Sequence, residues 1–137
     1  MNLSEENLTE NVRRAEGALA REHGGFFLFG LFQTEETAGK WDVVASAPWL
    51  TTARPGIQQI VSGLGDHLTA EDWLKIASIV PVSPDTNFIR TMTRLFRAEH
   101  EVQEAGAFVS EDIYINRAFI ITATKHPAQV EERQAAA

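Results

Sequence analysis

FFLFGLFQTEETAGKWDVVASAPWL, residues 26–50, is the stretch that decides the fold. Its first seven residues are apolar throughout, which is typical of a strand covered on both faces in the middle of a sheet. After a polar connection over 33–39, apolar residues at 41, 43, 45 and 47 alternate with the residues at 40, 42, 44 and 46. That alternation predicts a strand with one dry and one wetter face. The two runs together predict a hairpin at the centre of a sheet.

An amphipathic helix is predicted before this hairpin, over residues 3–23. Apolar residues recur there at intervals of three and four, at Leu8, Val12, Ala15 and Leu19. Ser4 is the expected N-cap, with Leu3 and Leu8 forming a hydrophobic staple, and Gly24 is the expected helix stop.

Three helices and two strands are predicted after the hairpin. Pro55 is expected to begin a helix with an apolar face at Ile57, Ile60, Val61 and Leu64, and Thr69 is expected to cap the next, with Asp72 completing a capping box. The remaining elements are a strand over 79–82, a helix over 86–104 and a strand over 113–124. Pro81 restricts the first of these strands to a sheet edge or to a position where its backbone nitrogen needs no pairing partner.

This order predicts a single α/β domain over residues 1–125 and a flexible tail over 126–137. The sheet is expected to be mixed, with about four strands formed by the central hairpin plus two helical crossovers, packed with about four helices. If each crossover is right-handed, the second, third and fourth strands run parallel.

Composition excludes several classes of site. The chain has 137 residues, a net charge of −7 and no cysteine, so disulfides and thiolate chemistry are absent. The acidic start lacks a secretory h-region, and no apolar run approaches the length of a membrane span, which predicts a cytoplasmic protein without membrane contact. Gly63-Leu64-Gly65 lacks the third glycine of a dinucleotide loop, and no metal or cofactor is expected.

Parallel strands bring their carboxyl ends to one edge of a sheet, where open α/β folds bind ligands. The topology predicts that His23 and the polar residues that follow the strands gather there. Arg54 is the candidate for holding a carboxylate or phosphate, and Asp85 with His126 or His23 is the candidate acid/base pair. The other candidate ligand-binding residues are Thr51, Thr52, Ser83, Thr86 and Asn87. Each also has an ordinary alternative as a turn, cap or tail residue.

A basic stripe is predicted on the helix over 86–104. Arg90, Arg94 and Arg97 are spaced four and three, so they share one side of that helix, which is either a solvated face or a candidate partner surface. The negative net charge argues against nucleic acid as that partner. Two acidic features are weaker candidates for a functional site. Asp42 is expected on the wetter face of its strand, either solvated or paired with lysine. Glu99, His100 and Glu101 are adjacent on a predicted helix, so their side chains cannot converge on one metal ion.

No catalytic motif is present, so the leading hypothesis is a noncatalytic domain that binds a protein partner, including itself as a homodimer. The alternative is a binder of a small anionic ligand, or an enzyme, at the sheet edge through Arg54, Asp85 and His126. Nucleic-acid binding through the arginine stripe is the second alternative.

Overall fold

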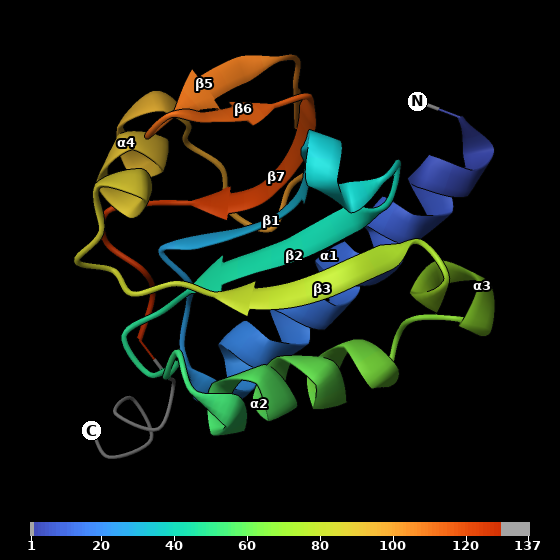
Figure 1. Cartoon of the computed structure of the whole chain (residues 1–137). Helices are drawn as coiled ribbons and strands as arrows, with labels where there is room; N and C mark the ends of the chain where they lie inside the picture. Colours follow the sequence, from blue (N-terminus) through green and yellow to red (C-terminus); the bar gives the residue numbers. More distant parts are fainter. Residues whose placement is uncertain (1, 130–137) are drawn as a thin grey trace.

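The computed structural model describes residues 2–129 and contains a mixed five-stranded sheet in the order β3-β2-β1-β7-β4 (Figure 1). The strands are β1 (Leu28–Gln33), β2 (Trp41–Ser46), β3 (Ile76–Pro81), β4 (Gln103–Ala105) and β7 (Arg117–Ala123). β5 (Phe108–Ser110) and β6 (Ile113–Ile115) pair separately as a small hairpin. The helices are α1 (Leu3–His23), α2 (Arg54–Gly65), α3 (Ala70–Trp73) and α4 (Asn87–Leu95), with a 3-10 turn η1 at Glu35–Thr37. The predicted fold class, a single α/β domain, is confirmed.

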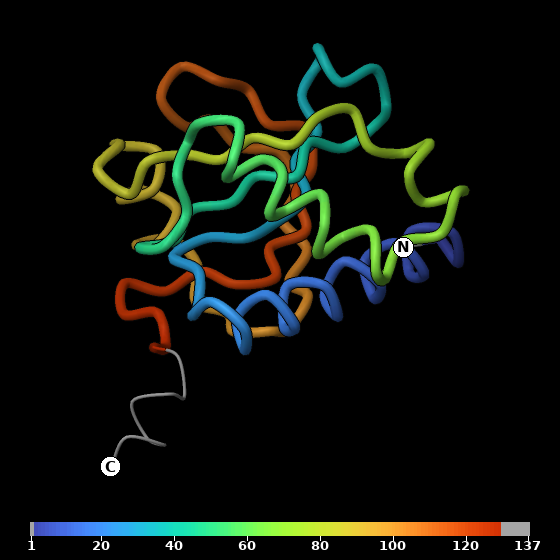
Figure 2. The backbone as a smooth tube through the Cα atoms, turned by 90° about the horizontal axis from the view of Figure 1, so that it is seen from below, coloured from blue at the N-terminus to red at the C-terminus, as the bar shows by residue number. Residues whose placement is uncertain are grey.

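Helices cover both faces of the sheet. α1 and α2 run side by side on one face (Figure 2), where they bury Phe29 and Leu31 of β1. α4 and the β5–β6 hairpin lie against the other face, where Leu28 and Phe32 are buried. β1 is therefore enclosed on both sides, which explains its unbroken apolar sequence and confirms its predicted central place.

The prediction that one face of β2 meets solvent is wrong over most of the strand. Val44 is 7% exposed and Ser46 is fully buried, although both lie on the side expected to meet water. Val44 belongs to the core cluster that includes Ile89 of α4 and Ile115 of β6. Only Lys40 and Asp42, at the start of this side, keep contact with solvent. Alternation in the sequence records side-chain type, whereas burial depends on what a distant segment places over the strand.

α1 has the predicted bounds but a different cap. Asn2, not Ser4, is the N-cap, and its Oδ1 accepts a hydrogen bond of 2.8 Å from the Glu5 backbone N–H. Leu3 becomes the first helical residue and is 70% exposed, so the predicted staple with Leu8 is absent. Gly24 ends the helix with a φ of 114°, as expected of a residue without a Cβ.

The middle helices are shorter or differently placed than predicted. α2 begins at Arg54, so Pro55 is its second residue, and Val61 of its expected apolar face is 40% exposed. Thr69 and Asp72 form the predicted capping box, but α3 is a single turn. Ile76 and Ala77, which the apolar spacing placed on the packing face of this helix, belong to β3 instead. β3 lies at the sheet edge, as Pro81 predicted.

The predicted helix over 86–104 is wrong beyond Leu95, where α4 ends. The chain then turns back along β7. Ala98 and Ala123 exchange two backbone hydrogen bonds, the Glu101 N–H donates to the Ile121 carbonyl, and β4 continues the pairing. These hydrogen bonds pair the backbone groups at the edge of β7. If the helix continued to residue 104, those edge groups would lack these partners. The predicted final strand is also divided, into β6 and β7.

The predicted strand directions are confirmed. β2 and β3 are parallel, and β7 is antiparallel to β1, so β7 runs the same way as β2. The arrowheads of β2, β3 and β7 accordingly point to the same side in Figure 1. The carboxyl ends of these three strands therefore lie at one edge of the sheet.

Candidate functional site

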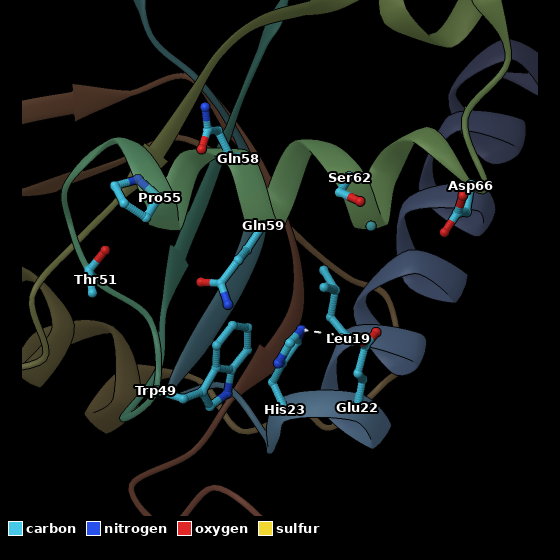
Figure 3. A pocket seen from close by; sticks show the side chains of 11 residues that line it. Leu19, Glu22, His23, Trp49, Thr51, Pro55, Gln58, Gln59, Ser62 and Asp66 are labelled. Carbon is cyan, nitrogen blue, oxygen red and sulfur yellow. Dashed lines mark ion pairs between the residues drawn. The ribbon is translucent and has the colours of Figure 1, made fainter.

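Two hollows lie at this carboxyl edge and share one wall. The first, of about 650 Å³, lies between the end of α1 and α2 (Figure 3). His23 and Thr51 line it together with Gln58 and Gln59 of α2 and with Asp66, the residue that follows α2. The wall between the two hollows is His23 stacked on Trp49, with ring centroids 4.7 Å apart. The Trp49 indole N–H donates to the Gly24 carbonyl at 2.8 Å, which fixes the ring over the end of α1.

The ionisable residues that line the second hollow, of about 640 Å³, are all of basic type. His23, Lys125 and His126 line it, and none of its other lining residues is acidic. The segment after β7 closes one side, because the Gly25 N–H donates to the Ala128 carbonyl at 2.7 Å. Thus the first residues of the predicted tail, 126–129, lie against the end of α1; residues 130–137 lie outside the described part of the chain.

Other predicted residues of this edge do not line either hollow. Thr52, Arg54 and Asp85 are exposed, and no hydrogen bond or ion pair between described residues joins Asp85 to His23 or His126. Ser83 and Thr86 serve the start of α4: the Ser83 carbonyl accepts from the Thr86 hydroxyl at 2.9 Å, and Thr86 is the N-cap. The structure gathers the two histidines but sets the candidate acid apart from them.

An apolar slot lies on the α4 side of the sheet. Its volume is about 310 Å³, and it is enclosed by β2 and β3 on one side and by β6 and the start of α4 on the other. Phe32 and Phe88 meet edge to face in its wall, with centroids 5.9 Å apart. The complete lining is Phe32, Thr34, Asp42, Val44, Val80, Val82, Thr86, Phe88, Ile113 and Ile115.

An acidic hollow of about 420 Å³ adjoins the slot, and Thr34, Asp42 and Ile113 line both. Asp42 Oδ1 accepts a 2.6 Å hydrogen bond from the Ser78 hydroxyl, so the Asp42 carboxylate is held between the two spaces. Asp42 is thus paired with a serine on β3, not with lysine as one sequence interpretation had it. The rest of the acidic hollow is formed by Glu35, Glu36, Asp112 and Tyr114.

Sequence reasoning missed this slot because its walls come from segments far apart in the chain. Val80 and Ile113 carry no local signal that they face each other, and residues 113–115 were expected to continue a single final strand. The exposed acids Glu35 and Glu36 lay in a connection that the sequence marked only as polar. The one available signal was Asp42, an acid inside an apolar strand.

A buried acid lies on the opposite face of the sheet. The Glu16 side chain is fully buried, and its oxygens accept from the Thr122 hydroxyl at 2.8 Å and contact His100 Nδ1 at 2.5 Å. Burial raises the pKa of Glu16 above its usual value, although the hydrogen bonds from His100 and Thr122 act to lower it. The sequence spacing indicates that Glu16 is buried, because Glu16 follows Val12 by four residues and so lies on the apolar face of α1.

The predicted arginine stripe is not continuous. Arg90 folds back on its own helix start, donating to the Asp85 carbonyl at 2.8 Å and to Asn87 Oδ1. Arg94 is in the last turn of α4, but Arg97 lies beyond the helix end. All three are exposed, and their role in partner binding stays a prediction.

Comparison with models of protein families, with curated proteins and with solved structures found no match. Within residues 2–129 no helix combines the length and the apolar character needed to cross a membrane. Nor do three or more metal-ligating side chains gather in that part of the chain closely enough to hold an ion. The geometry of the hollows is therefore the basis for a functional proposal.

Proposed function

We propose that the protein is a noncatalytic binding protein whose apolar slot holds a small, largely apolar ligand. The observation that carries this proposal is the slot itself, in which seven of the ten lining residues are valine, isoleucine or phenylalanine. Its volume is at the lower end of the range for ligand pockets, roughly 300 to 1,000 Å³. Asp42 is the one ionisable side chain in its lining, which supports binding over acid/base chemistry.

The slot has the physical features that favour an apolar ligand. Each Å² of apolar surface removed from water contributes roughly 25 cal/mol, and the phenylalanine, valine and isoleucine side chains of the slot offer such surface. Both Val44 and Phe32 belong to a packed core cluster, so the slot floor is preformed. A preformed pocket loses little conformational entropy when the ligand enters.

Filling the slot tests the proposal. Val80→Phe adds a ring at a half-buried lining position on the edge strand β3, and Val61→Phe makes the same change on the exposed side of α2. We expect the wild type and Val61→Phe to bind the uncharged fluorescent probe N-phenyl-1-naphthylamine, and Val80→Phe to bind it at least about tenfold more weakly because the ring occupies the slot. Fluorescence titration measures the affinity, and circular dichroism checks the fold. Equal affinity in a folded Val80→Phe variant overturns the proposal.

A second candidate function is anion binding at the carboxyl edge. It is favoured by the second hollow, whose ionisable lining residues are all basic: His23, Lys125 and His126. This candidate moves the main anion contact from Arg54, which lines neither edge hollow, to Lys125. Thr51 lines the first hollow and is retained as a neighbouring polar contact.

Charge removal tests this second candidate. We expect Lys125→Gln to weaken the binding of inorganic pyrophosphate several-fold, since a partly exposed charge pair contributes roughly 0.2 to 1 kcal/mol. Arg54→Gln removes the same charge outside the hollow and is the matched control. Isothermal titration calorimetry at low salt measures both. A larger loss in Arg54→Gln than in Lys125→Gln would return the anion contact to Arg54.

Self-association and a cytoplasmic location also remain predictions. The outer face of the β5–β6 hairpin supports the first, because Val109 and Tyr114 lie opposite each other in the pairing and both are exposed. Native mass spectrometry reports the number of subunits and any retained ligand in one measurement.

A further inference from the structure

We propose that the ligand of the slot is an amphipathic cation, with its apolar body in the slot and an ammonium group in the adjoining acidic hollow. This inference rests on the proposed function, because it names the chemical class of ligand for the same slot. It is carried by the continuity of the two spaces, which share Thr34, Asp42 and Ile113. A ligand that enters the slot from this side has its outer end among carboxylates.

The charge around that outer end has one sign. Glu35, Glu36, Asp42 and Asp112 all line the acidic hollow, and no lysine or arginine does. None of the four forms an ion pair with a basic side chain of residues 2–129. Four carboxylates without a basic partner favour a cation and disfavour an anion, both in the bound state and during approach.

Asp42 is placed to contact the cation itself. It is the one carboxylate that lines both spaces, and the bond from Ser78 to its Oδ1 fixes the group while the other oxygen accepts no hydrogen bond from a described residue. Across the hollow, Tyr114 contributes an exposed ring, and aromatic faces attract ammonium groups. Charge and aromatic surface together match a primary or quaternary ammonium.

Three probes share an eight-carbon chain and differ in their head group: octyltrimethylammonium, 1-octanol and octyl sulfate. Comparing them separates the contribution of the apolar chain to binding from that of the charged head group. Each is titrated below its micelle concentration against the protein carrying N-phenyl-1-naphthylamine. We expect the cation to displace the dye at about tenfold lower concentration than octanol, and octyl sulfate to be the weakest of the three. The advantage of the cation over octanol should shrink as salt screens the carboxylates.

Two variants and a control assign the preference to the acidic hollow. Asp42→Asn and Asp112→Asn each remove one carboxylate, and asparagine at 112 tolerates the φ of 66° that this hairpin residue adopts. We expect both to reduce the advantage of octyltrimethylammonium while leaving octanol displacement unchanged. Glu22→Gln, which removes an exposed acid at the sheet's other face, should leave the advantage intact.

The outcomes separate the two proposals. If octanol displaces the dye as well as the cation does, the ligand class is wrong while the slot remains a binding site. If Val80→Phe also leaves dye binding unchanged, the slot itself is not the site and both proposals fail. If octyl sulfate is the strongest competitor, the acidic hollow does not receive the head group, and the inference is overturned.

Discussion

Alanine at position 56 is expected to lower the free energy of unfolding by about 3 kcal/mol. Gly56 is buried in the first turn of α2, and a Cβ there would lie 1.9 Å from the Thr51 backbone oxygen. Backbone cannot rotate away as a flexible side chain can, so either the loop over 51–53 or the start of the helix must move. Urea unfolding followed by circular dichroism measures the loss.

Gly65→Ala is the matched control for this substitution. Gly65 ends the same helix, and a Cβ there meets no atom within 4 Å. Because alanine favours helix and restricts the unfolded chain, this change should raise stability by up to about 1 kcal/mol. If the Gly56→Ala variant unfolds at the same urea concentration as the wild type, the loop over 51–53 is not held against the helix. In that case Thr51 would not be a fixed wall of the first edge hollow.

The buried acid Glu16 is expected to make stability depend on pH in an unusual direction. Burial raises its pKa in the folded state above the ordinary value of 4.5, so the folded protein holds this proton more tightly than the unfolded chain does. The stability that Glu16 contributes is complete below about pH 4.5 and is lost as pH rises through its folded-state pKa. The difference in unfolding free energy between Glu16→Gln and the wild type should therefore increase in favour of the variant as pH rises above 4.5.

The pH dependence of the wild type must be compared with that of Glu16→Gln, because other carboxylates change the stability with pH in the opposite direction. The hydrogen bond from Arg13 is the main cause that lowers the pKa of half-buried Glu10 to about 2, so the stability that Glu10 contributes is lost as pH falls. Glutamine at 16 keeps both contacts, because its amide can accept from His100 and donate to the Thr122 hydroxyl. Urea midpoints at several pH values between 4 and 8 give the comparison, and Glu22→Gln is the exposed control. A constant difference across this range would contradict a raised pKa for Glu16.

His100 should stabilise the protein mainly through this acid. The His100→Ala variant removes one hydrogen bond to a buried group, and we expect a loss of about 1 kcal/mol at pH 7 because the ring is 43% exposed. In the Glu16→Gln background the same change should cost less. A double-mutant cycle measures the difference, and full additivity would show that the two side chains do not act together.

Local sequence patterns predicted the elements whose structure depends on near neighbours. The bounds of α1 follow from its apolar spacing and from Gly24, and the edge place of β3 follows from Pro81, which lacks the N–H that an inner strand needs. The sequence predicted the direction of β7 only on the condition that helical crossovers link parallel strands, and the pairing of β1 with both β2 and β7 bears out that direction.

The errors occur where distant segments decide the outcome. α4 stops at Leu95 because residues 98–105 pair with β7, and Val44 is buried because α4 and β6 cover its face of β2. The apolar slot is a larger case of the same effect, since Val80, Phe88 and Ile113 meet only in the folded sheet. At the carboxyl edge, topology predicted the shared location of His23 and His126, but not the separation of Asp85 from both.

The pairing of β1 with β7 has a consequence for synthesis of the protein. Leu28 is made early, and its partner in that pairing, Ala123, is made among the last residues of the described chain. Until residue 123 has emerged from the ribosome, one side of the phenylalanine-rich β1 has no strand to join, and its backbone and apolar side chains resemble an open sheet edge. The β1–β7 pairing can form only after residue 123 has left the exit tunnel, so the order of synthesis delays closure of the sheet centre.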